Sequence, residues 1–191
     1  MKSAELKVVP FKTVKAFEAW LKKNHASSPG IWMQLFKKGS DVKTITYAEA
    51  LDEALCYGWI DSQKKSYDAK SYILKFTPRR PKSIWSKVNI GHIARLTKIE
   101  KLQPSGKAQV EAAKKDGRWG QAYDSPKNMK VPEDFVIELK KHKKAYAFWG
   151  TLTKANVYAI AWRLQTAKKL ETREKRMGLI LEMLKKGQKF H

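Results

Sequence analysis

The sequence predicts an α+β protein: a small antiparallel sheet of about three strands packed with helices, followed by an all-helical C-terminal part. Three short segments in the first half of the chain are rich in β-branched and aromatic residues: 31–39, 59–67 and 69–78. From Pro132 onward the apolar residues recur instead at helical spacing. We therefore expect an N-terminal α+β part over residues 1–103 and a helical C-terminal part over residues 104–191, packed as one unit.

The first predicted helix lies in the segment 11–25, where four apolar residues recur at helical spacing: Phe11, Val14, Phe17 and Leu21. A Ser-Pro-Gly turn at 28–30 separates it from the first strand, which is expected to end near Gly39. The second helix, 46–58, has both ends marked, because Thr46 and Glu49 form a capping box and Gly58 stands at the C-terminal cap position. The other two strands follow, joined by a short polar turn.

Beyond Pro81 the chain becomes helical. The segments 89–103 and 105–117 resemble two successive helices broken at Pro104, and a connector rich in Gly and Pro follows. Three more helical segments are predicted at 132–142, 153–168 and 171–187. The last two carry apolar faces formed by Val157, Ile160, Ala161 and Leu164, and by Met177, Ile180, Leu181 and Leu184.

The composition is that of a globular protein. With 191 residues and 42% hydrophobic content, the chain can bury a substantial core. No apolar run approaches the roughly 18 residues needed to span a bilayer, and the opening segment lacks the apolar stretch of a signal peptide. The single Cys56 excludes an intrachain disulfide. These features predict a soluble, cytoplasmic protein.

The net charge of +22 is high for a chain of this size. Such a charge attracts polyanions, among them nucleic acid, with an affinity that falls steeply with salt. The excess is spread over both halves of the chain, with +10 in residues 1–95 and +12 in residues 96–191. Both a solvated basic surface and a polyanion-binding site therefore remain open.

The sequence predicts no metal site and no cofactor. The four histidines, His25, His92, His142 and His191, have no His, Cys or carboxylate partner at ligand spacing. Cys56 comes at the end of a predicted helix, where the helix dipole disfavours a thiolate, so a buried structural role is expected. Glycine-rich phosphate loops and the nucleophile-elbow motif of hydrolases do not occur.

The most distinctive stretch is FTPRRPKSIWSKVN at 76–89. Its two prolines constrain the residues before them, so Arg79 and Arg80 are expected to point in different directions. Strand alternation places Trp59 and Asp61 on one face, and a carboxylate on an inner face needs a partner, for which an arginine is suited.

The same stretch is predicted to bind an anion. Ser86 or Asn89 can cap the following helix, whose N-terminus favours negative charge. With Arg79, Arg80 and Lys82 they form a candidate pocket for a phosphate or carboxylate, with Asp61, Trp59 and Trp85 as orienting or wall residues. The alternative is purely structural: Asp61 and an arginine tie the fold together and Trp85 belongs to the core.

Four motifs together resemble the YdeI/OmpD-associated family, also described as bacteriocin-protection-like: YAEALDEALCYGWIDSQKK, FTPRRPKSIWSKVN, KDGRW and AKKLETREKR. The resemblance runs from Phe17 to Gly187, and departs from the family pattern at 98–103. Its signature positions are Gly58, Trp59, Asp61, Pro78, Arg79, Pro81, Ser83, Trp85, Ser86 and Asn89. The resemblance implies a role in envelope stress and in protection against bacteriocins or cationic antimicrobial peptides, without assigning a chemical role to any residue.

Three functions follow as expectations. The preferred one is an anion-binding protein that uses the Arg/Lys/Asn cluster. The second is an enzyme in which Asp61 acts with a neighbouring hydroxyl such as Ser62 or Ser86, which requires a raised pKa and no arginine partner. The third is a nucleic-acid-binding protein governed by the high positive charge.

Overall fold

The computed structural model describes residues 6–190, in which eight helices and a four-stranded sheet form two compact units. The first unit comprises the chain up to Trp85 together with Asn89–Gln121, and the second comprises Ser86–Val88 together with the chain from Ala122 onward. This division falls later along the chain than residue 103. Among residues 6–190 there is no helix with both the length and the apolar character needed to cross a bilayer.

The sheet confirms the α+β class and corrects its details. Its strands are β1 (Val8–Pro10), β2 (Ile31–Phe36), β3 (Trp59–Ser66) and β4 (Ser71–Pro78), in the order β1-β2-β4-β3. β1 runs parallel to β2 and the other pairs are antiparallel, so the sheet is mixed and has one strand more than predicted. The sequence missed β1 because three residues are too few to display a period of two.

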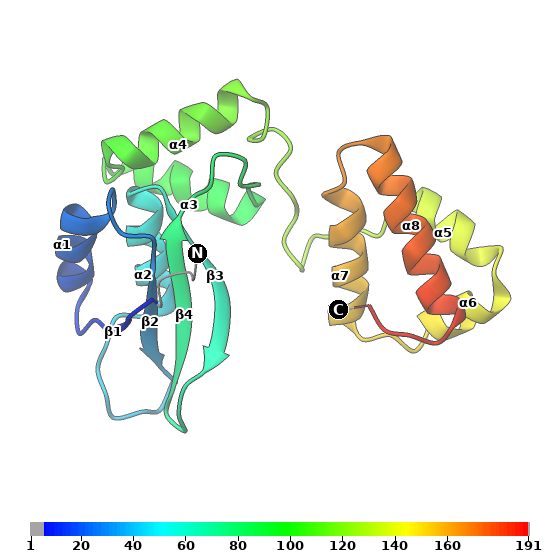
Figure 1. Ribbon diagram of the computed structural model, residues 1–191, viewed down its shortest axis with the longest axis horizontal. Helices are drawn as coiled ribbons and strands as arrows, with labels where there is room; N and C mark the ends of the chain where they lie inside the picture. The colour runs from blue at the N-terminus through cyan, green and yellow to red at the C-terminus, as the bar shows by residue number, and fades with distance from the viewer. Residues whose placement is uncertain (1–5, 191) are drawn as a thin grey trace. The chain divides into compact units, whose positions relative to one another are not determined.

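One face of the sheet forms the core of the first unit. Ile31, Met33 and Leu35 are buried on β2, whereas the residues between them are half-buried. Helices α1 (Val14–Asn24) and α2 (Tyr47–Cys56) pack on this face, and Phe17 of α1 contacts Phe76 of β4 with ring centroids 5.9 Å apart (Figure 1). Alternation along each strand therefore separates a helix-covered face from an outer face.

The ends of α2 lie as predicted. Thr46 and Glu49 form the capping box, and Gly58 has a φ of +76°, a left-handed conformation that favours glycine after a helix. Helices α3 (Lys87–Lys98) and α4 (Pro104–Lys115) follow β4 and lie beyond one end of the sheet, and Pro104 begins α4 (Figure 1). Gly106 lets α4 approach the end of α2, because a Cβ there would overlap the carbonyl oxygen of Cys56.

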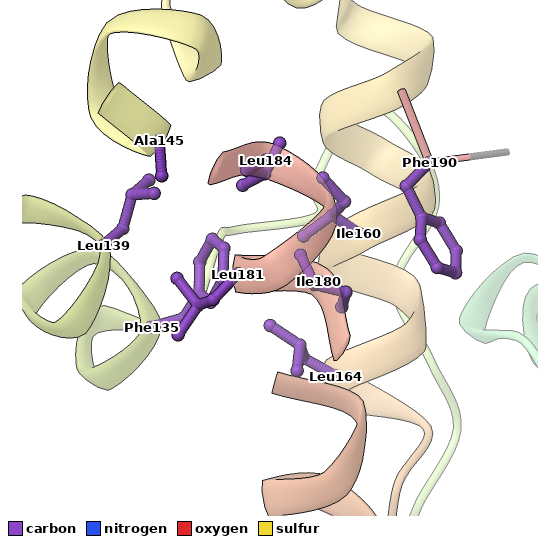
Figure 2. Packing of buried hydrophobic residues seen from close by; sticks show 9 residues of the cluster. All are labelled: Phe135, Leu139, Ala145, Ile160, Leu164, Ile180, Leu181, Leu184 and Phe190. Carbon is purple, nitrogen blue, oxygen red and sulfur yellow. The ribbon is translucent and has the colours of Figure 1, made fainter. Parts of the chain in front are cut away.

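The second unit contains helices α5 (Glu133–Lys140), α6 (Lys143–Trp149), α7 (Lys154–Gln165) and α8 (Leu170–Lys185). Their apolar faces, together with Phe190 after α8, form one cluster, shown in Figure 2: Phe135, Leu139, Ala145, Ile160, Leu164, Ile180, Leu181, Leu184 and Phe190. The predicted face of α8 is confirmed, since Ile180, Leu181 and Leu184 are buried and Met177 packs against them. Such clusters supply the main driving force for packing helices together.

Candidate functional site

The basic stretch after β4 folds into a closed turn. The Arg79 backbone N–H donates to the carbonyl oxygen of Gly58 at 3.0 Å, which holds the end of β4 to the start of β3. The N–H of Ser83 then donates to the carbonyl oxygen of Arg80 at 2.9 Å, and the Ser83 hydroxyl accepts from the N–H of Arg80 at 3.1 Å. Residues 80–83, which we call the basic turn, therefore have their backbone fixed at both ends.

Arg79 directly precedes the basic turn and has a structural role. Arg79 is only 5% exposed, and its guanidinium carbon lies 3.6 Å from the ring centroid of the fully buried Trp85. Its Nη1 donates to the carbonyl oxygen of Ile84 at 3.3 Å. A planar guanidinium is suited to this combination of stacking and hydrogen bonding. Trp85 thus belongs to the core, as the structural alternative predicted.

The KDGRW motif packs against the same residues. The Trp119 ring lies 4.9 Å from that of Trp85, between centroids. Arg118 donates from Nη1 to the carbonyl oxygen of Ser83 at 2.8 Å, and from Nε to the Asp116 carboxylate at 2.7 Å. Two motifs that are far apart in sequence therefore support one turn. In the sequence, KDGRW was notable only as part of a resemblance, and nothing there indicated that Arg118 holds the turn.

The basic turn itself presents positive charge to solvent. Arg80 and Lys82 are exposed, and in the part of the chain that the structure describes neither forms an ion pair with an acidic residue. The prediction that the two arginines point in different directions is confirmed, because Arg79 is buried and Arg80 is exposed. A turn with a fixed backbone and two exposed cations can accept an anionic group.

Asp61 has a hydrogen-bond partner, Tyr47, that the sequence did not predict. It lies opposite Phe76 on the helix-covered face, where its carboxylate accepts a hydrogen bond from the Tyr47 hydroxyl at 3.1 Å. Burial raises the pKa of Asp61. The hydrogen bond from Tyr47 opposes that rise, and the charge of Arg79 opposes it more weakly. The charge of Arg79 acts on this carboxylate, and an ion pair between Asp61 and an arginine stays a prediction. Trp59, on the same face, is buried, and its indole N–H donates to the carbonyl oxygen of His25 at 3.1 Å.

The two predicted helix-capping residues fall in different units: Asn89 is in the first unit, with the basic turn, and Ser86 is in the second. Ser86 is buried, pairs with Tyr123 through an isolated β-bridge and belongs to the second unit. Asn89 is half-buried and lies within the first turn of α3, which begins at Lys87. Among the predicted site residues, Arg79 stacks on Trp85, Arg80 and Lys82 follow in the basic turn, and the charge of Arg79 acts on Asp61.

A cluster that the sequence did not indicate joins α2 to α3. The Asp52 carboxylate lies 2.8 Å from Nδ1 of His92 and accepts from Arg95 at 2.6 Å. Burial alone would raise the pKa of Asp52, but the bonds from Arg95 and His92 outweigh it and lower the pKa. Asp52 is far from His92 and Arg95 in the sequence, so no local spacing indicated the cluster.

Metal-ligating and nucleophilic groups do not gather in the described part of the chain. Across residues 6–190, no three His, Cys, Asp or Glu side chains are placed to hold a metal ion, and His191 lies outside that range. Cys56 is buried, and burial raises the pKa of its thiol to about 12, so it is a protonated core residue at neutral pH.

A cavity of about 650 Å³ lies between the loop after β2 and the start of α2. Its lining includes three lysines and two tyrosines: Lys37, Lys38, Lys43, Tyr47 and Tyr72. Tyr47 is the residue whose hydroxyl binds Asp61. Tyr47, hydrogen-bonded to Asp61, therefore lines a cavity of the size that small ligands occupy.

Family models match both units. Residues 9–109, more than half of the chain, match a family described as a domain of unknown function (DUF8412). Residues 128–187 match the family described as bacteriocin-protection, YdeI or OmpD-associated. The chain belongs to the first family, and its second unit is a YdeI/OmpD-associated domain. No match was found among curated proteins or among solved structures.

The two matches divide the motifs that first suggested the family. The basic turn, Arg79, Trp85 and Asp61 all fall within residues 9–109, the domain of unknown function. Of the four motifs, AKKLETREKR lies within the YdeI/OmpD-associated domain. The candidate site therefore belongs to the part of the chain whose family description names no activity.

Proposed function

We propose that the protein binds anions, holding a phosphate or carboxylate group at Arg80 and Lys82 of the basic turn. The observation that supports this proposal is the contrast between the two neighbouring arginines: Arg79 is buried as a structural element, whereas Arg80 is exposed on the backbone that Arg79 supports. A turn fixed before the ligand arrives loses little conformational freedom on binding, which favours affinity.

Binding of an anionic cellular component also fits a role in envelope stress and in protection against bacteriocins or cationic antimicrobial peptides. A protein with a net charge of +22 repels a cationic peptide, so direct capture of the peptide is disfavoured. We propose that the protein acts in the cytoplasm on an anionic partner instead. The name of the YdeI/OmpD-associated domain supports this link to bacteriocin protection.

A thermal-shift titration of the full chain with phosphate, pyrophosphate and citrate tests the proposal. At a ligand concentration about 100 times the Kd, binding stabilises the folded state by about 2.7 kcal/mol, which corresponds to a rise in Tm of about 5 to 11 °C for a chain of this length. The shift should disappear in the Arg80→Ala/Lys82→Ala variant. It should persist in Lys140→Ala/Lys144→Ala, a control that removes the same charge from exposed positions of the second unit. An unchanged shift in the first variant would exclude the basic turn.

A second candidate function, acid–base catalysis by Asp61, is favoured by one observation. The pKa of Asp61 is raised by burial, and its partner Tyr47 lines the cavity of about 650 Å³. A carboxyl group with a raised pKa beside a ligand-sized cavity is suited to proton transfer. If a hydrolase or isomerase substrate screen detects turnover, Asp61→Asn should abolish it. Turnover that survives this change would rule out Asp61.

A further inference from the structure

The outer face of the sheet, turned away from α1 and α2, carries an aromatic side chain between lysines. Trp32 on β2 lies directly opposite Lys75 on β4, and both are half-buried. The next row across the sheet joins Gln34, Ile73 and Lys65 on three adjacent strands. Alternation places these side chains on the face opposite that of Met33 and Phe76.

The lysines of this face lie close to the tryptophan ring. The ammonium nitrogen of Lys65 is 4.9 Å from the centroid of the Trp32 ring, and that of Lys75 is 6.0 Å away. Both distances are within the range of a cation–π interaction. Trp32 is thus flanked by positive charge that an anionic ligand can recruit.

Positive charge continues from this face onto the adjoining loops. The backbone N–H of Lys37, directly after β2, donates to the carbonyl oxygen of Lys70 in the β3–β4 hairpin, so the two loops lie together. Exposed lysines on these loops and on β3 are Lys37, Lys38, Lys43, Lys64, Lys65 and Lys70. Asp41 and Asp68 are the acidic residues of the same loops. The excess of lysines makes this end of the sheet complementary to a polyanion.

We propose that the outer face of the sheet binds single-stranded nucleic acid, with a base stacked on Trp32 and the adjacent phosphates held by Lys65 and Lys75. An unpaired base has an exposed π-face that stacks on an aromatic side chain, whereas the bases of a duplex are already stacked on one another. When a base covers Trp32, the ammonium groups now near its ring can move to the phosphates on either side. Acidic polysaccharides offer the charge without the base, so they would not engage Trp32.

This site is independent of the basic turn. Trp32, Lys65 and Lys75 belong to the outer face of the sheet, whereas Arg80 and Lys82 lie in the turn that follows β4. Loss of either site leaves the other intact. The Arg80→Ala/Lys82→Ala variant therefore distinguishes a failure of this inference from a failure of the proposed function.

Fluorescence anisotropy of the full chain with labelled dT12 and rU12 tests the proposal, and heparin serves as a polyanion without bases. We expect Trp32→Leu to weaken binding of both oligonucleotides by about 5- to 150-fold, because the side chain stays apolar but loses its stacking face. Trp32→Phe keeps an aromatic ring and should retain most of the affinity. Binding of heparin should be the same in all three proteins. Circular dichroism confirms that each variant is folded.

The lysines are tested through the salt dependence. Replacing Lys65 and Lys75 with alanine should reduce the magnitude of the slope of log K against log salt by about 1.4, the value for two lost phosphate contacts on a single strand. The control Lys140→Ala/Lys144→Ala should leave the slope unchanged. The proposal is overturned if the wild-type protein fails to bind either oligonucleotide, if Trp32→Leu binds as tightly as wild type, or if Trp32→Leu weakens heparin binding equally.

Discussion

Replacing Arg79 tests whether the signature arginine is structural. The Arg79→Ala change removes a hydrogen bond from a charged donor to Ile84, worth about 1.5–3 kcal/mol. It also removes a desolvated stacking contact with Trp85, worth about 2 kcal/mol. We therefore expect the free energy of unfolding to fall by about 3.5–5 kcal/mol.

The assay is urea denaturation followed by tryptophan fluorescence, with Arg80→Ala as the matched control. Arg80 is the adjacent residue with the same side chain, but it is exposed, so its loss should change stability by no more than about 0.5 kcal/mol. Arg79→Lys should be nearly as destabilising as Arg79→Ala, because an ammonium cannot reproduce a planar guanidinium on a tryptophan ring. Equal stability of the Arg79→Ala and Arg80→Ala variants would refute the structural role of Arg79.

Two further predictions concern packing and pH. Gly106→Ala should destabilise the protein by about 2–4 kcal/mol, because its Cβ would overlap the carbonyl oxygen of Cys56. Gly91→Ala, in an open position of α3, should instead stabilise the protein by about 0.5–1 kcal/mol. Urea denaturation of the two variants checks both expectations, and similar effects of the two changes would contradict the packing of α4 against the end of α2. The raised pKa of Asp61 means that the folded wild type loses stability as the pH rises from about 3.8 through the folded pKa, so Asp61→Asn should become more stable relative to wild type over that interval. A stability difference that does not change with pH would contradict the burial of this carboxyl group.

Local signals in the sequence were sufficient for most of the fold. The capping box of Thr46 and Glu49 and the glycine at position 58 mark both ends of α2, and the alternation in β2 and β4 marks the strands. Each of these features is set by residues that are near one another along the chain. β1 was missed because its three residues carry no period and gain their structure only by pairing with β2.

The candidate site was predictable in its residues but not in its contacts. The prolines indicated that Arg79 and Arg80 diverge, but only the packing of Trp85 and Trp119 determines which of the two is buried. The sequence did not indicate the hydrogen bond from Tyr47 to Asp61 for the same reason: Tyr47 reaches it from α2, and no local spacing in the sequence predicts that approach.

On the outer face of the sheet, local sequence patterns predict which residues share the face but not which of them are neighbours. Strand alternation places the side chains of Trp32 and Met33 on opposite faces of the sheet. This can be predicted from the sequence once β2 is assigned. That Lys65 and Lys75 flank its ring depends on the registers of β2 with β4 and of β4 with β3, including the irregularity in β3. Registers are set by the packed sheet as a whole.

The central claim is that the basic turn binds an anion while Arg79 supports it. A titration of the 15N-labelled protein with pyrophosphate, followed by two-dimensional NMR, tests this claim most directly. We predict that the largest shifts occur at the amides of Arg80, Lys82 and Ser83, and that they saturate with a single Kd. Shifts that do not saturate, or that leave these three amides unchanged, would contradict the claim.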